Sequence, residues 1–268
     1  MKTIIIPDLH NRVEIVESAL SSPALQPYNN VVFLGDYFDD FYDTPQDTAN
    51  SAIWLKQSLH KPNRIHLLGT HDMWYRFPDN PFVMASGNTE EKSDAINHII
   101  TEKDWNMIRP YHYEQDFLMT HAGVHPYLIG QYALKNKQIF GKYIVGNNLQ
   151  LSTQEIVDRI IKPATEEALR DVKNNISNSW FEAGFARMGM QKIGGITWLD
   201  WQKEFQPIPD LNQIVGHSEL RIPEQKSTHN SKNYCLDTKS QHIGILENGE
   251  FTYVETIDVL EATNGEYQ

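Results

Sequence analysis

Short apolar runs that each end in a polar motif are the feature that most constrains how this chain of 268 residues can fold. Each run is bounded by turn-forming residues, which is typical of a buried strand. Side chains that follow the carboxyl ends of strands meet at one edge of an open α/β sheet. We therefore expect five motifs to converge. They are Asp8-x-His10, Gly35-Asp36-x-x-Asp39, Gly69-x-His71-Asp72, His121-Ala122-Gly123 and Gly216-His217.

The first third of the chain alternates between strand and helix patterns. Strands are expected at residues 3–7, 31–34 and 64–68. Between them, residues 13–20 carry apolar side chains at helical spacing. Residues 44–59 form a second expected helix, with Thr44 as the N-cap and Pro45 at the first helical position. This β-α-β-α-β order predicts a largely parallel sheet.

The rest of the chain gives a coarser pattern. Helices are expected at residues 90–101 and 153–172, and strands at 117–120, 213–215, 233–236, 242–246 and 251–255. Asn248-Gly249 predicts a hairpin between the last two strands. We expect residues 1–255 to form one domain, with residues 224–233 as a polar loop. The Trp- and Gly-rich residues 174–210 could form a cap or insert, and residues 256–268 a C-terminal tail.

Composition excludes several classes of partner. The formal net charge of −12 argues against binding to nucleic acid and to an anionic membrane surface. The single cysteine, Cys235, cannot form an intrachain disulfide, and we expect it to be buried. The apolar N-terminal run is too short for a signal peptide, and no run approaches the roughly 20 residues of a membrane helix. A cytoplasmic protein is therefore expected.

The chemistry of the five motifs is consistent. Carboxylate oxygens and imidazole nitrogens are ligands for divalent manganese, iron and zinc. One Asp-x-His pair or one Gly-Asp turn is weak evidence, because both are common in ordinary loops. Five such motifs in succession, each after an expected strand, indicate a metal centre.

This ordered set resembles the calcineurin-like metallophosphoesterases. The segments Gly35–Asp39 and Thr120–Val124 are similar to two motifs of the branch that contains the phosphoprotein phosphatases and the symmetrical diadenosine tetraphosphatases. The segment Gly195–Leu199 is similar to the Leu-Trp segment of that branch, and Leu236-Asp237-Thr238 to its C-terminal strands. The resemblance covers residues 1–255 and is weakest in the middle.

The resemblance implies an α/β fold, a four-layer αββα sandwich with two mixed β-sheets. It also implies a binuclear centre of two divalent ions, with manganese expected and iron, zinc or nickel as alternatives. Asp36 would bridge the ions, a hydroxide between them would attack phosphorus, and His71 would protonate the leaving oxygen while Asp39 orients it. The metal ligands implied by the motifs are Asp8, His10, Asp36, Thr70, His121 and His217.

Three positions depart from the family pattern. Position 70 is Thr where the family has Asn, and a hydroxyl is a poorer ligand for the second ion. Position 219 is Glu where many relatives have a second His. Position 40 is Asp where the phosphoprotein phosphatases have an Arg that binds phosphate. We select Arg76 as the replacement, with Arg109 and Arg221 as alternatives, although each is more often a surface or helix-capping residue.

Other candidates have ordinary structural roles. We expect His125 in an exposed loop, Asp72 as a cap rather than a ligand, and Trp198 and Trp201 as packing residues rather than base-stacking platforms.

The sequence therefore predicts a hydrolase acting on phosphate ester bonds. Its expected substrate is a phosphomonoester or phosphoanhydride, carried by a phosphorylated small molecule such as a nucleotide or by a phosphoprotein. A nucleotide phosphodiesterase is one alternative. A non-catalytic binding module with the same fold is another, motivated by Thr70 and Asp40. The acidic charge and the absence of a basic run argue against a nuclease.

Overall fold

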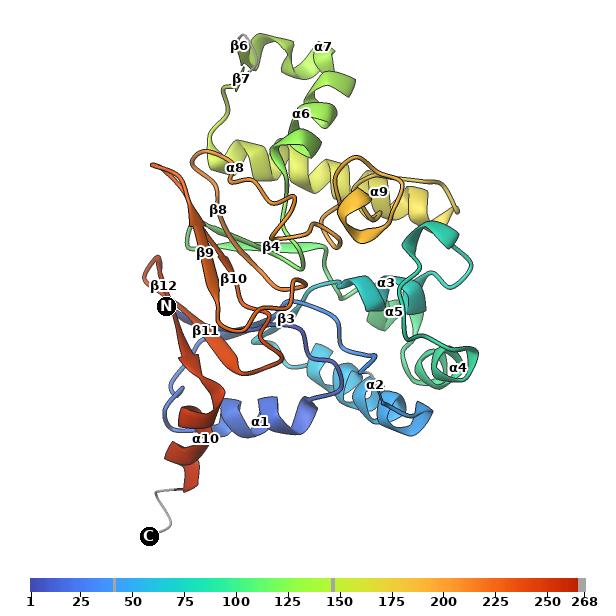
Figure 1. Ribbon diagram of the computed structural model, residues 1–268, viewed down its shortest axis with the longest axis vertical. Helices are drawn as coiled ribbons and strands as arrows, with labels where there is room; N and C mark the ends of the chain where they lie inside the picture. The colour runs from blue at the N-terminus through green and yellow to red at the C-terminus, as the bar shows by residue number, and fades with distance from the viewer. Residues whose placement is uncertain (41, 146–147, 265–268) are drawn as a thin grey trace.

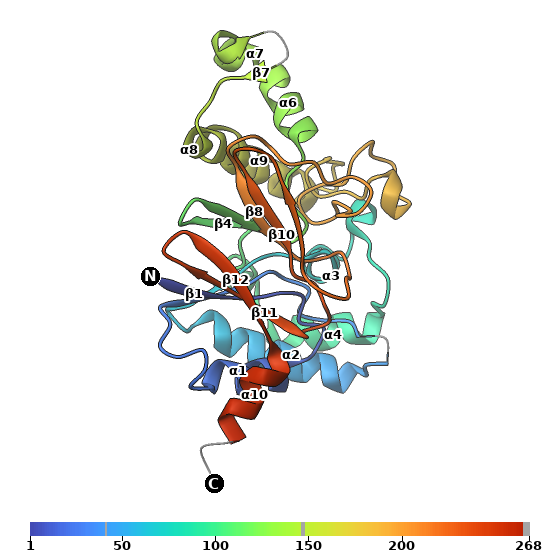
Figure 2. The ribbon, with the colours of Figure 1, turned by 60° about the vertical axis from the view of Figure 1, so that its left-hand side comes forward.

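Two five-stranded sheets face each other in the computed structural model, which describes residues 1–40, 42–145 and 148–264. Helices lie on the outer side of both sheets, so the molecule has four layers (Figure 1; Figure 2). Both sheets contain parallel and antiparallel pairs. The α/β sandwich with two mixed sheets that the sequence predicts is confirmed.

The first sheet has the order β12-β11-β1-β2-β3. Strands β1, β2 and β3 run parallel to one another, while β11 runs antiparallel to both of its neighbours, β1 and β12. The strands are β1 (Lys2–Ile6), β2 (Asn30–Phe33), β3 (Arg64–His66), β11 (His242–Glu247) and β12 (Glu250–Glu255). The parallel part arises from the β-α-β-α-β order of the first third of the chain.

The second sheet has the order β4-β5-β8-β10-β9. Here β5, β8 and β10 are parallel, and the edge strands β4 and β9 are antiparallel to their neighbours. The strands are β4 (Tyr111–Glu114), β5 (Phe117–Thr120), β8 (Asn212–Val215), β9 (Glu224–Ser227) and β10 (Lys232–Cys235). A separate short pair, β6 (Ile144–Val145) and β7 (Asn148–Leu149), lies at the far end of the molecule (Figure 1).

The inner faces of the two sheets share one apolar core. Both sheets contribute fully buried side chains to it, including Ile5 of β1, Val32 of β2, Met119 of β5 and Ile214 of β8. Burial of such residues stabilises the fold by about 25 cal/mol for each Å² of apolar surface removed from water. This shared core fixes the two sheets against each other and therefore fixes the loops at their carboxyl ends.

Helices pack on the outer faces. On the first sheet, α1 buries Val16, Ala19 and Leu20, and Ser22 at its end donates a hydrogen bond to the carbonyl of Val259 in α10. The helices are α1 (Val13–Ser21), α2 (Pro45–Leu59), α3 (Thr70–Arg76), α4 (Glu90–Ile99), α5 (Glu102–Trp105), α6 (Pro126–Lys135), α7 (Lys137–Phe140), α8 (Thr153–Ile156), α9 (Lys162–Lys173) and α10 (Thr256–Asn264).

The long helix expected at residues 153–172 is present but not regular. Between α8 and α9 it contains a π-helical turn, Val157–Ile161. Pro163 lies in the first turn of α9 and cannot donate the backbone hydrogen bond of an uninterrupted α-helix. The whole run, α8 through α9, covers the outer face of the second sheet (Figure 2).

The structure corrects three sequence expectations. Part of the expected loop at 224–233 is strand β9, which sequence patterning missed because its residues are all polar. The described part of the expected C-terminal tail, residues 256–264, forms helix α10, in which Val259 is buried, and residues 265–268 lie outside the described residues. His125 is buried rather than exposed, because its ring caps the N-terminus of α6 by accepting a hydrogen bond from the backbone of Tyr127.

Residues 174–210 form an irregular segment with one short helical turn, Phe185–Arg187. Buried carboxylates hold it together in place of regular structure. Glu204 accepts hydrogen bonds from the backbone N–H groups of Gly194 and Asp200, and Glu182 accepts from Asn178. None of the helices in the described parts of the chain is long and apolar enough to cross a membrane.

Candidate metal centre

The five motifs meet at the carboxyl ends of strands from both sheets. Asp8 follows β1, Asp36 follows β2, His121 follows β5 and His217 follows β8. Two groups of potential ligand atoms result, each lying within 4.8 Å of one another. One group is Asp8, His10 and Asp36, and the other is Asp36, His121 and His217. Asp36 belongs to both groups.

The histidine rings are held with one nitrogen free to act as a ligand. Nδ1 of His10 lies 2.8 Å from the carbonyl oxygen of Asp39, and Nδ1 of His121 lies 2.9 Å from that of Leu34. A carbonyl can only accept, so each Nδ1 carries a proton, and Nε2 is the nitrogen that can bind a metal ion after losing its own proton. The Nε2 of His121 is buried, has no hydrogen-bond partner among the described residues and lies 3.3 Å from Oδ2 of Asp36. This is the orientation expected of metal ligands.

Thr70 lies beside the ring of His217, but its hydroxyl already forms hydrogen bonds within the protein. It donates a hydrogen bond to the carbonyl of Thr197, and its oxygen lies 3.3 Å from Nδ1 of His217. The oxygen can therefore accept from Nδ1, which leaves the buried Nε2 of His217 without a partner among the described residues. In this geometry, Thr70 orients His217 rather than pointing a lone pair into the cluster.

The buried carboxylates of the cluster lack cationic partners. Asp8 and Asp36 are 1% and 2% exposed, and neither forms an ion pair with a Lys or Arg of the described residues. Burial and the nearby carboxylate of Asp237 raise the pKa of Asp8 well above its usual range. Burial also opposes ionisation of Asp36, but the rings of His121 and His71 outweigh it and lower the pKa of that carboxyl. Buried carboxylates and orphaned imidazole nitrogens together fit divalent cations.

The backbone around the cluster adopts conformations that most residues avoid. Asp36 and His217 have φ values of 50° and 64°, in the left-handed region. The glycines of the motifs are needed for space, because a Cβ on Gly69 would overlap Asp36 and a Cβ on Gly216 would overlap the carboxylate of Asp8. The Gly-Asp and Gly-His pairs in the sequence reflect this close approach.

His71 and Asp39 form a dyad next to the cluster. Nδ1 of His71 lies 3.0 Å from Oδ2 of Asp39, and the backbone N–H of His71 donates to Oδ1 of Asp36. Burial alone would lower the pKa of His71, but the carboxylates of Asp36 and Asp39 outweigh it and raise that pKa to about 9. His71 is therefore held as a proton donor that faces the cluster, with its ring centroid 5.3 Å from that of His10.

Asp72 has the structural role expected from the sequence. Its buried carboxylate accepts hydrogen bonds from the backbone N–H groups of Asp36, Tyr37 and Gly69. It thereby caps α3 and ties the second motif to the third.

Two of the departures from the family pattern lie outside the cluster. Asp40 pairs with Arg12, with 3.3 Å between Oδ2 and Nη2. Glu219 is exposed and pairs with Lys239 at 3.0 Å. Neither side chain belongs to the two ligand groups among the described residues.

The arginine predicted to bind phosphate is elsewhere. Arg76 lies at the far end of α3 and donates a hydrogen bond to Asn106, and the cleft that it lines contains no member of the metal cluster. Arg109 lines a different depression beside Tyr111 and Glu166. The structure therefore does not support the choice of Arg76.

Arg187 is an arginine that the fold brings close to His217, while Arg12 shares a depression with His10. Arg187 comes from the irregular segment, donates a hydrogen bond to Ser218 at 3.1 Å and forms an ion pair with Asp200. After burial and the charge of His121, the charge of Arg187 is the next cause that lowers the pKa of His217. No periodic pattern surrounds Arg187, so the sequence offered no signal that could have selected it.

Trp198 and Trp201 differ in position. Trp201 is fully buried against Phe205, as expected of a packing residue. Trp198 is half-buried, and its ring centroid lies 5.8 Å from that of His217. Its buried Nε1 has no hydrogen-bond partner among the described residues.

Comparison with known proteins gives relatives by structure alone. No family model and no curated protein matches the chain. A cold-active protein-tyrosine phosphatase of a psychrophilic Shewanella species aligns with a TM-score of 0.55 and 15% identity, covering 95% of this chain and 78% of that chain. A further structure of a cold-active protein tyrosine phosphatase aligns with a TM-score of 0.52 and 14% identity, covering 94% and 78%. At these identities the chain shares the fold of these phosphatases.

Proposed function

We propose that this protein is a metal-dependent phosphoesterase that hydrolyses a phosphomonoester or phosphoanhydride. The observation that carries the proposal is the pair of ligand groups that share Asp36 beside the His71–Asp39 dyad. Proton donors next to a cationic centre suit the cleavage of a phosphate ester, in which negative charge develops on the leaving oxygen.

The ligand groups divide between two divalent ions, for which manganese is our first choice. Asp8, His10 and Asp36 would hold one ion, and Asp36, His121 and His217 the other. When bound, such ions lower the pKa of water toward about 7 and offset the charge of the phosphoryl oxygens. Thr70 would act by fixing the ring of His217, through the contact already described.

The remaining steps belong to the residues of the chain. His71 would give its proton to the leaving oxygen, and Asp39 would hold the ring by its other nitrogen. Arg187 would bind a phosphoryl oxygen, in the role that the sequence assigned to Arg76. Burial of the cluster keeps bulk water from competing for these contacts.

Two features support an aryl phosphate as the first substrate to test. The structurally similar phosphatases are named protein-tyrosine phosphatases, which brings phosphotyrosine peptides into consideration. The half-buried ring of Trp198 lies beside His217, where it could contact an aromatic group of the substrate. Nucleotides remain the second class, as the sequence resemblance implies.

The test is hydrolysis of p-nitrophenyl phosphate with and without Mn²⁺. We expect activity that requires the ion, a loss of more than about 100-fold in Asp36→Asn, and a loss of about 100-fold or more in His71→Ala. His98→Ala, which changes an exposed histidine of α4, is the matched control and should retain full activity. Hydrolysis of bis(p-nitrophenyl) phosphate at a comparable rate would favour a phosphodiesterase instead.

A non-catalytic binding module is the second candidate, because the hydroxyl of Thr70 is engaged and position 40 lacks an arginine. Metal analysis separates the two. Two ions per chain together with turnover support the enzyme, whereas no turnover with manganese, iron, zinc or nickel and at most one ion per chain would favour the module.

A further inference from the structure

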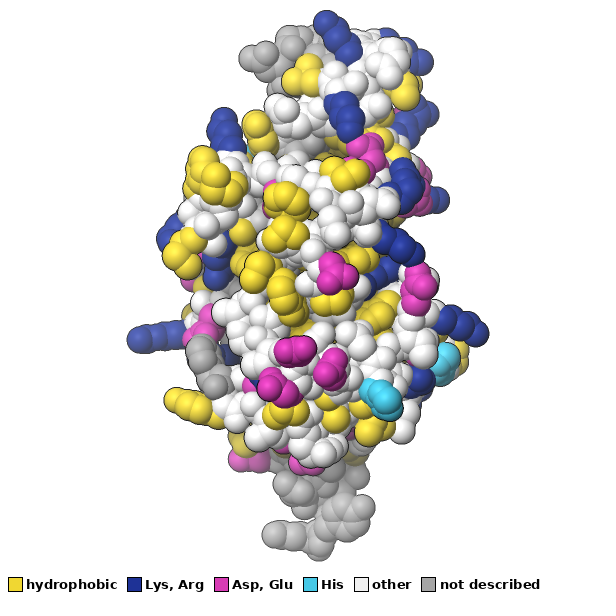
Figure 3. Space-filling view, turned by 90° about the vertical axis from the view of Figure 1, so that its right-hand side faces the viewer, with side chains coloured by type: hydrophobic (Ala, Val, Ile, Leu, Met, Phe, Trp, Pro, Cys, Tyr) yellow, Lys and Arg dark blue, Asp and Glu magenta, His cyan; other side chains and the backbone are white. Residues whose placement is uncertain are grey.

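A large cleft lies away from the metal cluster, between the helices that follow the first sheet and the long helix on the second. Its volume is about 680 Å³, within the range of small-molecule sites. Residues from the end of α3, from α4 and α5, and from α9 line it. Figure 3 faces the side of the molecule on which these helices lie, and charged side chains of both signs are interspersed there with apolar ones.

Arg76 lies in this cleft and forms no ion pair or hydrogen bond with a carboxylate of the described residues, although the charge of Glu102 acts on it from a distance. It donates one hydrogen bond, from Nη2 to the neutral side chain of Asn106 at 3.1 Å, and its guanidinium carbon lies 5.2 Å from the ring centroid of Phe77. Its Nη1 is buried and has no hydrogen-bond acceptor in the described parts of the chain. Burial lowers the pKa of Arg76 to about 10, and the nearby charge of Glu102 offsets only part of this cost. An incoming anion would remove that cost.

A second unpaired donor lies in the same cleft. Trp105 is 4% exposed, and its Nε1 is likewise buried without an acceptor among the residues described. Buried indole N–H groups normally have a partner, so two orphaned donors in one cleft are unusual.

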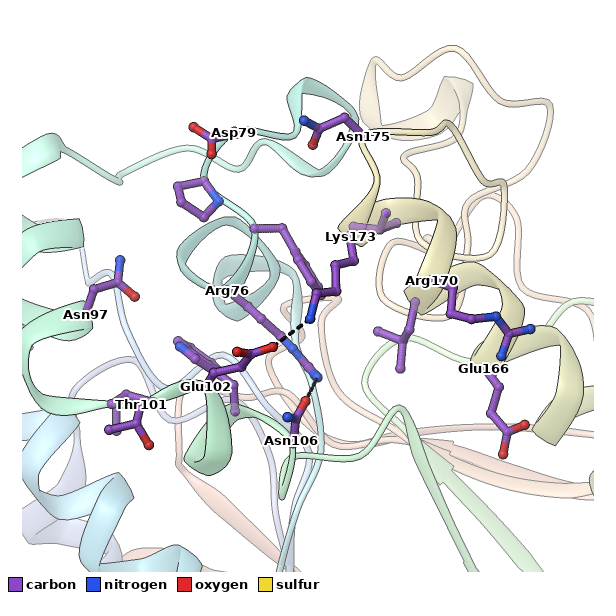
Figure 4. A pocket seen from close by; sticks show the side chains of 16 residues that line it. Arg76, Asp79, Asn97, Thr101, Glu102, Asn106, Glu166, Arg170, Lys173 and Asn175 are labelled. Atoms are coloured by element: carbon purple, nitrogen blue, oxygen red, sulfur yellow. Dashed lines mark hydrogen bonds and ion pairs between the residues drawn. The ribbon is translucent and has the colours of Figure 1, made fainter.

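The mouth of the cleft is crossed by an ion pair that can open at low cost. Nζ of Lys173 on α9 lies 2.6 Å from Oε1 of Glu102 on α5, and both side chains are exposed. Figure 4 shows this pair beside the guanidinium group of Arg76. An exposed pair of this kind is weak, so its rearrangement would let a ligand reach Arg76.

The residues that line the cleft determine the charge and the apolar part of the ligand that it can bind. They carry three cations and three acids, so the lining has no net formal charge, and the orphaned Nη1 of Arg76 accounts for one negative charge on the ligand. The apolar lining offers contact for a ring or a short aliphatic chain. The charged residues are Arg76, Arg170, Lys173, Asp79, Glu102 and Glu166.

We propose that this cleft binds a small monocarboxylate with an aromatic or aliphatic body, whose carboxylate pairs with Arg76 while its body packs on the apolar wall. The site is separate from the metal cluster, and the proposal does not depend on the catalytic function. It gives Arg76 a ligand-binding role of a different kind from the phosphate contact that the sequence suggested.

The test uses naphthalene-2-carboxylate as the probe and its uncharged amide, naphthalene-2-carboxamide, as the matched ligand. Calorimetry on the full chain should detect binding of the carboxylate, with the amide at least about tenfold weaker because it lacks the charge-assisted bond. Arg76→Gln should weaken binding of the carboxylate by a similar factor, and Arg76→Lys by less. Arg221→Gln, the same change at an exposed arginine outside the cleft, should leave binding unaltered.

A local signal places the ligand in the cleft even if Arg76→Gln unfolds the chain. The chain has 6 tryptophans, and comparison with Trp105→Phe identifies the indole N–H resonance of Trp105 in a proton–nitrogen spectrum. We expect this resonance to shift when naphthalene-2-carboxylate is added. Binding of the amide with equal affinity, binding that Arg76→Gln leaves unchanged, or an unmoved Trp105 resonance would each overturn the proposal.

Discussion

Nζ of Lys92 lies 3.1 Å from Oδ1 of Asp39, while His71 takes the other oxygen of the same carboxylate. Lys92 is 5% exposed, and it also bonds Asp43 at 2.6 Å and the carbonyl of Gly87. The hydroxyl of Tyr75 donates to Oδ1 of Asp39 as well. The carboxylate that orients the proposed acid is therefore fixed from two further sides.

We predict that Lys92→Met impairs protonation of the leaving group. Its kcat for phenyl phosphate should fall about tenfold more than its kcat for p-nitrophenyl phosphate, because p-nitrophenolate leaves with little need for a proton. Lys92→Arg should recover part of the loss. Tyr75→Phe should show the same dependence on the leaving group, whereas Lys103→Met on the exposed face of α5 should not. Equal losses on both substrates would contradict this role.

Thr70→Val should weaken the second metal site selectively. The variant keeps the shape of the side chain but removes the oxygen that contacts Nδ1 of His217. Loss of such an orienting contact typically costs about 10–100-fold in metal affinity. Titration with Mn²⁺ should show one of two binding steps weakened, and Thr70→Ser should restore it. If both steps stay unchanged, Thr70 does not position His217.

Arg187→Met should weaken phosphate binding. Loss of a charge-assisted contact should weaken phosphate binding by about 10–100-fold. The change should appear as a higher KM for p-nitrophenyl phosphate and as weaker inhibition by inorganic phosphate. Arg159→Met is the control, because that arginine is exposed and lies in the helical run on the outer face of the second sheet. An unaltered inhibition constant for phosphate would show that Arg187 does not contact the substrate.

His66 should make the stability of the fold depend on pH. It is buried in the first half of the chain, stacked on Phe33 and in contact with the hydroxyls of Ser58 and Tyr37. Burial, and secondarily the charge of Arg64, lowers the pKa of His66 to about 3, against about 6.5 in an unfolded chain.

Between these values, the unfolded state binds a proton that the folded state does not. The contribution of His66 to stability is therefore complete above pH 6.5 and is lost as the pH falls toward 3, at up to about 1.4 kcal/mol per unit. Urea unfolding from pH 7 to 4 should show a shallower decline for His66→Phe than for the wild type. Parallel declines would mean that other groups dominate.

The sequence could predict that the candidate ligands converge because they follow strands directly. Asp8, Asp36, His121 and His217 each lie within three residues of a strand end, so local patterning and the geometry of parallel strands were enough to bring them together. The strand patterns predicted the parallel part of the first sheet, whereas the arrangement in two mixed sheets was implied by the family resemblance.

Residues positioned by long-range contacts could not be found in this way. Lys92 follows two glutamates at the start of α4 and resembles a solvated helix residue, and only the fold places Asp39 and Asp43 around it. Arg187 depends on a segment built from buried carboxylates rather than from periodic apolar residues. Arg76 shares the short helix α3 with His71 but lines a different cleft, because residues of one helix point to different sides of it.

The left-handed backbone at Asp36 and His217 also has a consequence for the evolution of related proteins. Each such position costs of the order of 1–3 kcal/mol in a residue other than glycine, and a working centre has to retain both side chains despite that cost. A related protein that no longer needs the centre would become more stable if glycine replaced the residue at either position. We therefore expect relatives with glycine at position 36 or 217 to have lost catalytic activity. Their melting temperatures should exceed those of relatives that kept the ligands.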